Sequence, residues 1–194
     1  MNADRPHRPA PVAGLVLAAG RGSRFGRPKA LVEDDGGSWL RRSAAVLLDG
    51  GCERVVAVLG AAAEAAVVHL EDLPRTTVVV AGDWDRGLSA SLRTGLEALV
   101  LSDADVAVVT LVDLPDLHAG VVRRLLDRLG SAPDVLGRAT YDGRPGHPVL
   151  LGRNHWPGVA SGAVGDMGAS SYLARHGSSR VECGDLATGA DVDA

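Results

Sequence analysis

An apolar run that opens into a glycine-rich, cationic loop is the feature that most constrains the fold of this chain. The run reads VAGLVLAA from Val12 to Ala19, without the polar alternation of a half-exposed strand. Such a run predicts a strand that is buried on both faces, as in a parallel sheet. From Gly20 to Leu31 the chain then carries three glycines, one proline and four cationic side chains. A buried strand followed by such a loop is typical of an α/β fold that binds a phosphorylated ligand.

Apolar residues after this loop alternate between strand and helix spacing. The spacing predicts further strands in residues 53–59, 76–81 and 106–112, and helices between Ser38 and Gly50 and in residues 61–70, 88–99 and 118–129. Beyond Ala132 the pattern loosens, and we expect strands in residues 135–141, 149–151 and 180–183 between glycine-rich segments. The sequence therefore predicts a three-layer α/β fold with a doubly wound, mostly parallel sheet, in which ligands bind beyond the carboxyl ends of the strands.

The length of 194 residues predicts one domain in residues 12–194, in which residues 132–194 complete one wall of the site of residues 12–131. Residues 1–11 hold three prolines and two arginines without periodicity, which predicts a disordered lead-in. Its composition does not resemble a signal peptide.

Charge and cysteine content exclude several classes of protein. The net charge is −4 and the 20 Lys and Arg are dispersed, so a nucleic-acid partner is not expected. Cys52 and Cys183 lie far apart and predict buried thiols in a reduced compartment rather than a disulfide framework. No apolar stretch reaches the roughly 18 residues that span a bilayer, and we expect a cytoplasmic protein without a membrane partner.

The glycine spacing of the first loop argues against two common phosphate loops. Gly20, Gly22 and Gly26 are spaced GxGxxxG, whereas a dinucleotide site requires GxGxxG. Gly26 is followed by Arg27, whereas a P-loop requires Gly-Lys-Ser/Thr. Hydride transfer and Walker-type ATPase chemistry are therefore disfavoured.

The remaining interpretation is a loop that offers backbone N–H groups together with Arg24 and Lys29. Such a loop suits a triphosphate whose charge must be neutralised as a bond to phosphorus breaks. The alternative is a solvated basic turn between a strand and a helix. We prefer this alternative for Arg21 and Arg27, and phosphate binding for Arg24 and Lys29.

Two acidic residues are candidate metal ligands. Asp113 ends the apolar run of residues 106–112 and is followed by Leu114 and Pro115, so its carboxylate is placed to hold Mg²⁺ or only to form a turn. Asp166 lies between glycines in the segment GDMGA, where a simple glycine-rich turn is the alternative. Asp116 is placed to cap the following helix.

Read together, these residues resemble a known family. The segment LAAGRGSRFGRPKAL is similar to the signature LAAGxGxRMGxxKxL of the MobA-like NTP transferases, with Phe25 where Met is commoner. Within that family the chain most resembles the molybdenum cofactor cytidylyltransferases, and the similarity extends over nearly the whole chain from Val12. Near the C-terminus the family pattern DxDTPEDL is not completed, so we leave Asp191 and Asp193 outside the predicted site.

The resemblance implies a role for each motif. Arg24 and Lys29 would hold the triphosphate and act in catalysis with Asp113, while Asp113 and Asp166 would bind Mg²⁺, with Mn²⁺ as the alternative metal. The nucleotide would also contact Leu17, Ala18, Ala19, Gly20, Gly22, Ser23, Ser89 and Ser91, the two last from a segment similar to NxxWxxGxxSSL. Capping of a helix is an equally good explanation of these serines. Gly146, His147 and Pro148, from a GxxGHP segment, would contact the acceptor.

The resemblance also implies a reaction. CMP would pass from CTP to the phosphate of molybdenum-bound molybdopterin, with release of pyrophosphate and with a molybdoenzyme or its chaperone as a candidate partner. CTP is favoured over GTP because similar cytidylyl enzymes read LAAG where guanylyl enzymes read LAGG, and Ala19 is the residue that differs. Two alternatives stay open: a nucleotidyltransferase for another small phosphorylated acceptor, and a nucleotide-binding accessory protein without activity.

Overall fold

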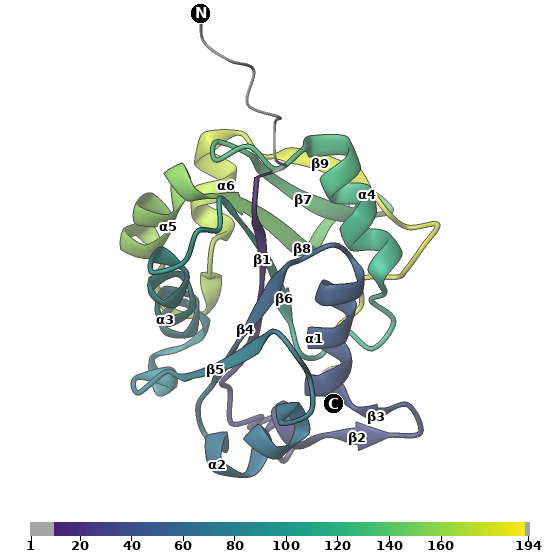
Figure 1. The fold of residues 1–194 in the computed structure, drawn as a ribbon, viewed down its shortest axis with the longest axis vertical. Coiled ribbons are helices and arrows are strands. Elements are labelled where there is room, and N and C mark those ends of the chain that lie inside the picture. The colour runs from purple at the N-terminus through teal and green to yellow at the C-terminus, as the bar shows by residue number, and fades with distance from the viewer. Residues whose placement is uncertain (1–9, 193–194) are drawn as a thin grey trace, which may run out of the picture.

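Seven strands form one sheet in the computed structural model, which describes residues 10–192 (Figure 1). Their order across the sheet is β5-β4-β1-β6-β8-β7-β9. The strands are β1 Val12–Ala18, β4 Arg54–Leu59, β5 Thr76–Val80, β6 Val106–Leu111, β7 Leu136–Tyr141, β8 Arg144–Gly152 and β9 Ser179–Glu182. All neighbours pair in parallel except β8, which is antiparallel to both β6 and β7. The predicted fold class, a mostly parallel doubly wound sheet, is confirmed.

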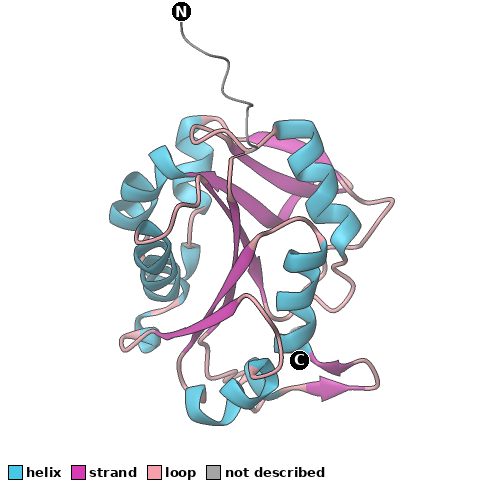
Figure 2. Ribbon diagram, viewed as in Figure 1, coloured by secondary structure: helices cyan, strands magenta, loops and turns pink. Residues whose placement is uncertain are grey.

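Helices cover both faces of this sheet. They are α1 Trp39–Asp49, α2 Ala63–Ala66, α3 Leu88–Val100, α4 Ala119–Leu129, α5 Trp156–Gly162 and α6 Ser170–His176. Single 3₁₀ turns are η1 Lys29–Leu31, η2 Val67–Leu70, η3 Trp84–Arg86, η4 Arg153–His155 and η5 Gly165–Met167. Helices α1 and α4 lie on one face and α3, α5 and α6 on the other, so the magenta sheet of Figure 2 separates two cyan layers.

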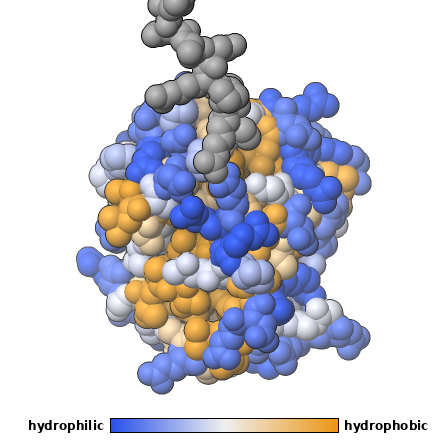
Figure 3. Space-filling model, in the orientation of Figure 1, coloured by the Kyte–Doolittle hydropathy of each residue, from blue (hydrophilic) through white to orange (hydrophobic). Residues whose placement is uncertain are grey.

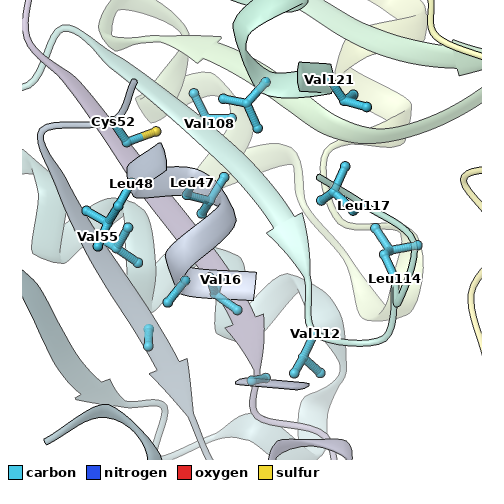
Figure 4. Close-up of a cluster of buried hydrophobic side chains, with 14 of the residues drawn as sticks. Val16, Leu47, Leu48, Cys52, Val55, Val108, Val112, Leu114, Leu117 and Val121 are labelled. Atoms are coloured by element: carbon cyan, nitrogen blue, oxygen red, sulfur yellow. The ribbon is translucent and has the colours of Figure 1, made fainter. Parts of the chain in front are cut away.

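The first strand is buried on both faces, as its unbroken apolar run predicts. Leu15 packs in the core cluster under α3 and α5, Val16 packs in the cluster under α1 and α4, and both are 0% exposed. Figure 4 shows Val16 close to Leu47 of α1 in the second of these clusters. Because β1 pairs with β4 on one side and β6 on the other, it is an interior strand of the sheet.

Helix ends follow the capping residues that the sequence offers. Ser38 precedes α1, and its hydroxyl accepts a hydrogen bond from the N–H of Arg41. Gly50 follows the last residue of α1, as predicted. At α4 the cap is His118 rather than the predicted Asp116, because the His118 ring Nδ1 accepts from the N–H of Gly120 while the Asp116 carboxylate accepts from Thr188.

Two predictions of secondary structure need correction. Residues 61–70 were expected to form one helix, but the structure has the short α2 followed by the 3₁₀ turn η2, with no side-chain cap on either. The glycine-rich segments after residue 152 contain α5 and α6, which the loose apolar spacing did not predict. Both are short helices that depend on packing against α3 and each other more than on their own periodicity.

A small hairpin of β2 Glu33–Asp34 and β3 Gly37–Ser38 was also not predicted. Its Asp34 carboxylate accepts from the N–H of Gly36, the indole of Trp39 and both terminal nitrogens of Arg42. The Arg42 guanidinium and the Trp39 indole hold the pKa of Asp34 well below its usual range. One acidic side chain thus ties the hairpin to the first turn of α1.

The expected lead-in, residues 1–11, falls mainly outside the described residues, as does Asp193. Pro11 is described, and its carbonyl accepts from the N–H of Asp105. Both cysteines are buried, as predicted. None of the helices described here is long and apolar enough to cross a membrane. Apolar residues on the face in Figure 3 form orange patches between hydrophilic ones.

Candidate functional site

A cavity of about 570 Å³ lies at the carboxyl ends of β1 and β6. The segment after β1 lines it with Ala19, Gly20, Gly22, Ser23, Arg24, Phe25 and Lys29, and β1 itself with Leu17 and Ala18. The remaining walls are Trp84, Gly87, Leu88, Ser91, Leu111, Val112, Asp113 and Asp166. The structure therefore brings together most of the residues that the sequence proposed for the nucleotide and the metal, from segments far apart in the chain.

The loop after β1 depends on glycine at a defined point. Gly22 and Gly26 have φ angles of +65° and +84°, a region that other residues rarely adopt. The N–H of Gly26 donates to the carbonyl of Gly22 over 2.8 Å and closes the loop. A Cβ at Gly22 would overlap the carbonyl oxygen of Arg27. This fold of the loop places Arg24 in the wall of the cavity, while Arg27 does not line it.

Lys29 and Asp113 form an ion pair within the cavity. Lys29 Nζ lies 2.7 Å from Asp113 Oδ2, and each side chain is 14% exposed. The second carboxylate oxygen, Asp113 Oδ1, is buried without a hydrogen-bond partner among the described residues. A buried carboxylate oxygen without a donor is unusual in a folded protein and is a suitable ligand atom for a hard cation.

Asp113 is held in place by its neighbours along the chain. Val112, Leu114 and Leu117 are buried on either side of it, and Figure 4 labels all three among the side chains of this core cluster. The N–H of Val112 donates to the carbonyl of Leu17, which ties the end of β6 to β1. The apolar residues of this segment thus fix the backbone from which the carboxylate projects.

Asp166 reaches the same cavity from the opposite half of the chain. Its Oδ1 accepts from the N–H of Leu88 over 3.3 Å, at the first turn of α3. Gly87 has a φ angle of +98°, and a Cβ there would lie 2.6 Å from this carboxylate oxygen. Glycine at position 87 therefore lets the second acidic residue approach the helix. Exposed apolar side chains of Val164 and Met167 flank Asp166.

The apolar wall of the cavity includes two aromatic residues that the sequence did not single out as site residues, Phe25 and Trp84. Trp84 packs on the turn after β4, where a Cβ at Gly60 would lie 2.7 Å from its ring atom Cγ. Ala19 is 3% exposed, and its carbonyl accepts from the N–H of Ala61 in that turn. The only signal for Trp84 was its place in the segment that is similar to NxxWxxGxxSSL.

Of the two predicted serines on α3, Ser91 lines the cavity and Ser89 does not. Ser89 is 1% exposed, and its hydroxyl has no hydrogen-bond partner among the described residues. It precedes Leu92 and Leu96 by three and seven residues, which places it on the stripe that packs against the sheet. Helical periodicity thus turns Ser89 toward the core, outside the cavity lining, and its contact with a nucleotide stays a prediction.

Gly146, His147 and Pro148 lie on β8, outside the lining of this cavity. Gly146 packs against the ring of Tyr141, whose hydroxyl donates to the carbonyl of His147 over 2.6 Å. Burial and the nearby Arg138 lower the pKa of His147 to about 4, so its ring is neutral near pH 7. The predicted acceptor residues on β8 are thus separated by strand β6 from β1 and its loop, which carry most of the predicted nucleotide residues.

Comparison with known proteins agrees with this geometry. Residues 14–181 match the MobA-like NTP transferase domain. The chain belongs to this family. The match extends from β1 into β9, so the family assignment covers both the glycine-rich loop and the second half of the sheet. It supports nucleotidyltransferase activity.

Proteins similar to this chain carry different activities in their names. Nicotine blue oxidoreductase of Paenarthrobacter nicotinovorans is 37% identical over 192 residues, covering 94% of this chain and 92% of that protein. A probable molybdenum cofactor guanylyltransferase of Bacillus cytotoxicus is 28% identical over 118 residues, covering 61% of this chain and 57% of that protein.

A solved structure shows the same architecture. Rv0371c of Mycobacterium tuberculosis superposes with a TM-score of 0.77 at 30% identity and covers 96% of this chain and 94% of that chain. A second structure of Rv0371c is a complex with manganese, with a TM-score of 0.75 at 27% identity over 94% of each chain. Together with the family, this complex suggests that a divalent metal acts in such proteins.

The carboxylates of the cavity are suited to a metal ion that is bound jointly by the protein and by a substrate. Among the described residues no group of three or more His, Cys, Asp and Glu is placed to hold a metal ion. Asp113 and Asp166 nevertheless both line the cavity, and Asp113 Oδ1 lacks a partner there. Mg²⁺ is usually bound by one or two carboxylates together with substrate phosphates and water. The carboxylates therefore suit a metal that enters with a nucleotide.

Proposed function

We propose that this protein transfers a nucleoside monophosphate from an NTP to a phosphorylated acceptor and releases pyrophosphate. The observation that carries the proposal is the Lys29–Asp113 pair in a cavity that also holds the glycine-rich loop, Arg24 and Asp166. Cationic groups and carboxylates in one cavity match what transfer at phosphorus needs, namely charge neutralisation and a place for a metal. The family assignment supports the same class of reaction.

In the proposed reaction an oxygen of the acceptor phosphate attacks the α-phosphorus of the NTP. A new phosphorus–oxygen bond forms, the bond from the α-phosphorus to the bridging oxygen breaks, and pyrophosphate leaves with its charge. Arg24 and Lys29 bind and neutralise the phosphates, and the N–H groups of the loop orient them. A phosphate nucleophile is already ionised near neutral pH, so no general base is needed. Asp113 and Asp166 would hold Mg²⁺ or Mn²⁺, which supplies further charge stabilisation when bound.

We further propose that the base is cytosine. The support is Ala19, a buried residue whose methyl group narrows the cavity relative to glycine. Steric discrimination of this kind is worth about 1–3 kcal/mol. Because one relative is named as a guanylyltransferase, GTP is the alternative nucleotide donor to test.

For the acceptor we propose molybdenum-bound molybdopterin, with Gly146, His147 and Pro148 near it and with a molybdoenzyme or its chaperone receiving the product. The support is the resemblance of the motifs and the relative named for molybdenum cofactor synthesis. A sugar phosphate or alcohol phosphate is the alternative acceptor.

The decisive experiment measures pyrophosphate release with each of the four NTPs, with Mg²⁺ or Mn²⁺ and with extracted molybdopterin as acceptor. We expect release with CTP that requires metal and acceptor. Release with GTP alone would overturn the cytidylyl assignment. The protein could instead bind NTP in a metal-dependent way but release no pyrophosphate, whether molybdopterin or a panel of sugar phosphates is offered as acceptor. That result would overturn the enzymatic proposal in favour of an accessory role.

A second candidate, an oxidoreductase, is favoured by one observation. The relative named nicotine blue oxidoreductase is 37% identical over 94% of this chain. In that case a reduced nicotinamide dinucleotide would occupy the cavity and pass a hydride to a dye-like acceptor, leaving oxidised dinucleotide and the two-electron-reduced dye. The GxGxxxG spacing argues against this reading. Oxidation of NADH or NADPH in the presence of a quinone-type dye, lost in Lys29→Ala, would favour it.

A further inference from the structure

Two arginines lie side by side on the half of the sheet that follows the nucleotide cavity. Arg138 on β7 and Arg180 on β9 are directly opposite each other in parallel register. Residues opposite each other on neighbouring strands project from the same face, with backbones about 4.8 Å apart. Like charges in this position destabilise a sheet unless something compensates them.

Neither arginine forms an ion pair with a carboxylate within residues 10–192. Arg138 donates from Nε and Nη2 to the carbonyl of Gly146 over 3.2 and 3.0 Å, and no acidic side chain of the described residues forms an ion pair with Arg138 or Arg180. By contrast, Arg42 and Arg124 both form bidentate pairs with carboxylates. Burial and the charge of Arg180 lower the pKa of Arg138.

The nearest acidic residue in sequence is already engaged. Glu182 follows Arg180 by two positions, but its carboxylate accepts from the hydroxyl of Thr140 and from three backbone N–H groups, those of Asp142, Gly143 and Gly184. It therefore serves the turn between β7 and β8 rather than the arginines. The positive charge of the arginine pair is therefore available to bind an anionic ligand.

By strand alternation the arginine pair projects from the face of the sheet that α3, α5 and α6 cover. Leu136 of β7 belongs to the core cluster under α3, α5 and α6, and Arg138 follows it by two residues. Leu17, which lines the cavity, belongs to the same cluster. Strand β7 is two strands from β6, and Arg138 pairs with Val149, which pairs with Val109. The backbone of Arg138 therefore lies about 10 Å across the sheet from β6, at a level four residues before Asp113. The guanidinium extends to Gly146, next to the predicted acceptor residue His147.

We propose that Arg138 and Arg180 form a binding site for an anionic group, a phosphate or a carboxylate, of the acceptor. This inference rests on the proposed function, because it assigns the second substrate of that reaction to this face of the sheet. The bound anion would lie between the two guanidinium groups and relieve their repulsion. It would also hold the acceptor beside the α-phosphate, which makes these arginines binding residues rather than catalytic ones.

The kinetic test compares Arg138→Ala and Arg180→Ala with Arg123→Ala, an exposed arginine of α4 on the opposite face. Each of the first two variants should raise the KM for the acceptor about 10-fold to 100-fold, as expected for a lost charge-assisted hydrogen bond. The affinity for CTP, measured by calorimetry, should stay within about twofold of the wild type. An unchanged acceptor KM in both variants would overturn the proposal.

A test without turnover keeps the inference separate from the proposed function. With CTP saturating the cavity, inorganic phosphate should raise the Tm of the wild type and of Arg123→Ala but not that of Arg138→Ala. Arg180→Glu should raise the Tm without phosphate, because a carboxylate then faces Arg138, and should abolish the effect of phosphate. Equal phosphate effects in all variants would overturn the anion site. If no NTP supports pyrophosphate release, the proposed function fails, and the phosphate titration still decides this inference.

Discussion

The site depends on one residue pair more than on any other. Lys29, from the loop after β1, and Asp113, just after β6, meet at 2.7 Å in a largely buried position. A buried ion pair costs desolvation free energy, so it contributes little to stability by itself and is best explained by chemistry that needs both charges. A triphosphate would compete with Asp113 for Lys29, and a metal would compete with Lys29 for Asp113.

The first prediction at this scale concerns Lys29→Ala. We expect turnover to fall about 100-fold or more, because the variant loses a cation that stabilises charge on the departing pyrophosphate. Far-UV circular dichroism should be unchanged. Arg27→Ala, a change in the same loop outside the cavity, should keep at least about half of the activity. Near-normal pyrophosphate release from Lys29→Ala would remove Lys29 from the mechanism.

A second prediction at this scale concerns the choice of base. Ala19→Gly removes the methyl group that narrows the cavity, so the ratio of kcat/KM for CTP over GTP should fall by about 5-fold to 150-fold, the range expected for 1–3 kcal/mol. Ala18→Gly is a matched control that shortens a neighbouring side chain. Equal ratios in the wild type and Ala19→Gly would show that another residue selects the base.

At the scale of elements, the turn between β7 and β8 is organised by a carboxylate from β9. Glu182 accepts from Gly143, Gly184, Thr140 and Asp142, and these donors lower its pKa to about 2. One side chain thereby joins the β7–β8 hairpin to the segment after β9. This hairpin carries Arg138 at one end and the GHP segment on its second strand.

This network predicts a specific dependence of stability on pH. A glutamate has a pKa of about 4.3 in an unfolded chain, so the lowered pKa of Glu182 stabilises the fold above that pH, and this contribution is lost as the pH falls to about 2. Glu182→Gln should therefore have a lower Tm than the wild type at pH 7. The two values should converge as the pH approaches 2. Glu97→Gln is a control on α3, and a constant difference in Tm between pH 7 and pH 3 for Glu182→Gln would contradict the assignment.

At the scale of the whole molecule, the cavity joins elements that are distant in sequence. Its walls come from the loop after β1, the start of α3, the end of β6 and the turn η5, which lies in the second half of the chain. A ligand that contacts all of them stabilises the folded state relative to the unfolded chain. The binding of nucleotide should therefore be visible in global unfolding.

We predict that CTP with Mg²⁺ or Mn²⁺ raises the Tm. At about 100 times the Kd the stabilisation is about 2.7 kcal/mol, which corresponds to about 5–11 °C for a chain of this length. EDTA should remove most of this shift, because the metal that Asp113 and Asp166 would hold would supply charge neutralisation for the phosphates. Asp113→Asn should show a much smaller metal-dependent shift, while Asp116→Asn, a neighbour that does not line the cavity, should keep it. A shift that is insensitive to EDTA would contradict the metal site.

Much of the site could be predicted because its residues are close together in sequence. The glycines, Arg24 and Lys29 occupy one loop. The apolar run before them predicts a buried strand, and in a parallel sheet its carboxyl end lies at the same edge as the carboxyl end of β6. Asp113 could be identified because it ends such a run. Ser89 could not be assigned from its motif, since the same residue also fits the apolar stripe of α3, and packing decided which way it points.

The sequence by itself therefore determined the fold class, the central strand and the residues of the first loop, because hydrophobic periodicity and glycine content act over short distances along the chain. Only the tertiary structure decided that Trp84 and Phe25 form part of the cavity wall. It also decided that Arg138 and Arg180 are neighbours. The physical reason is strand order. Which strands pair depends on the burial of the whole sheet, and the local sequences of β7 and β9 do not indicate that these two strands are neighbours.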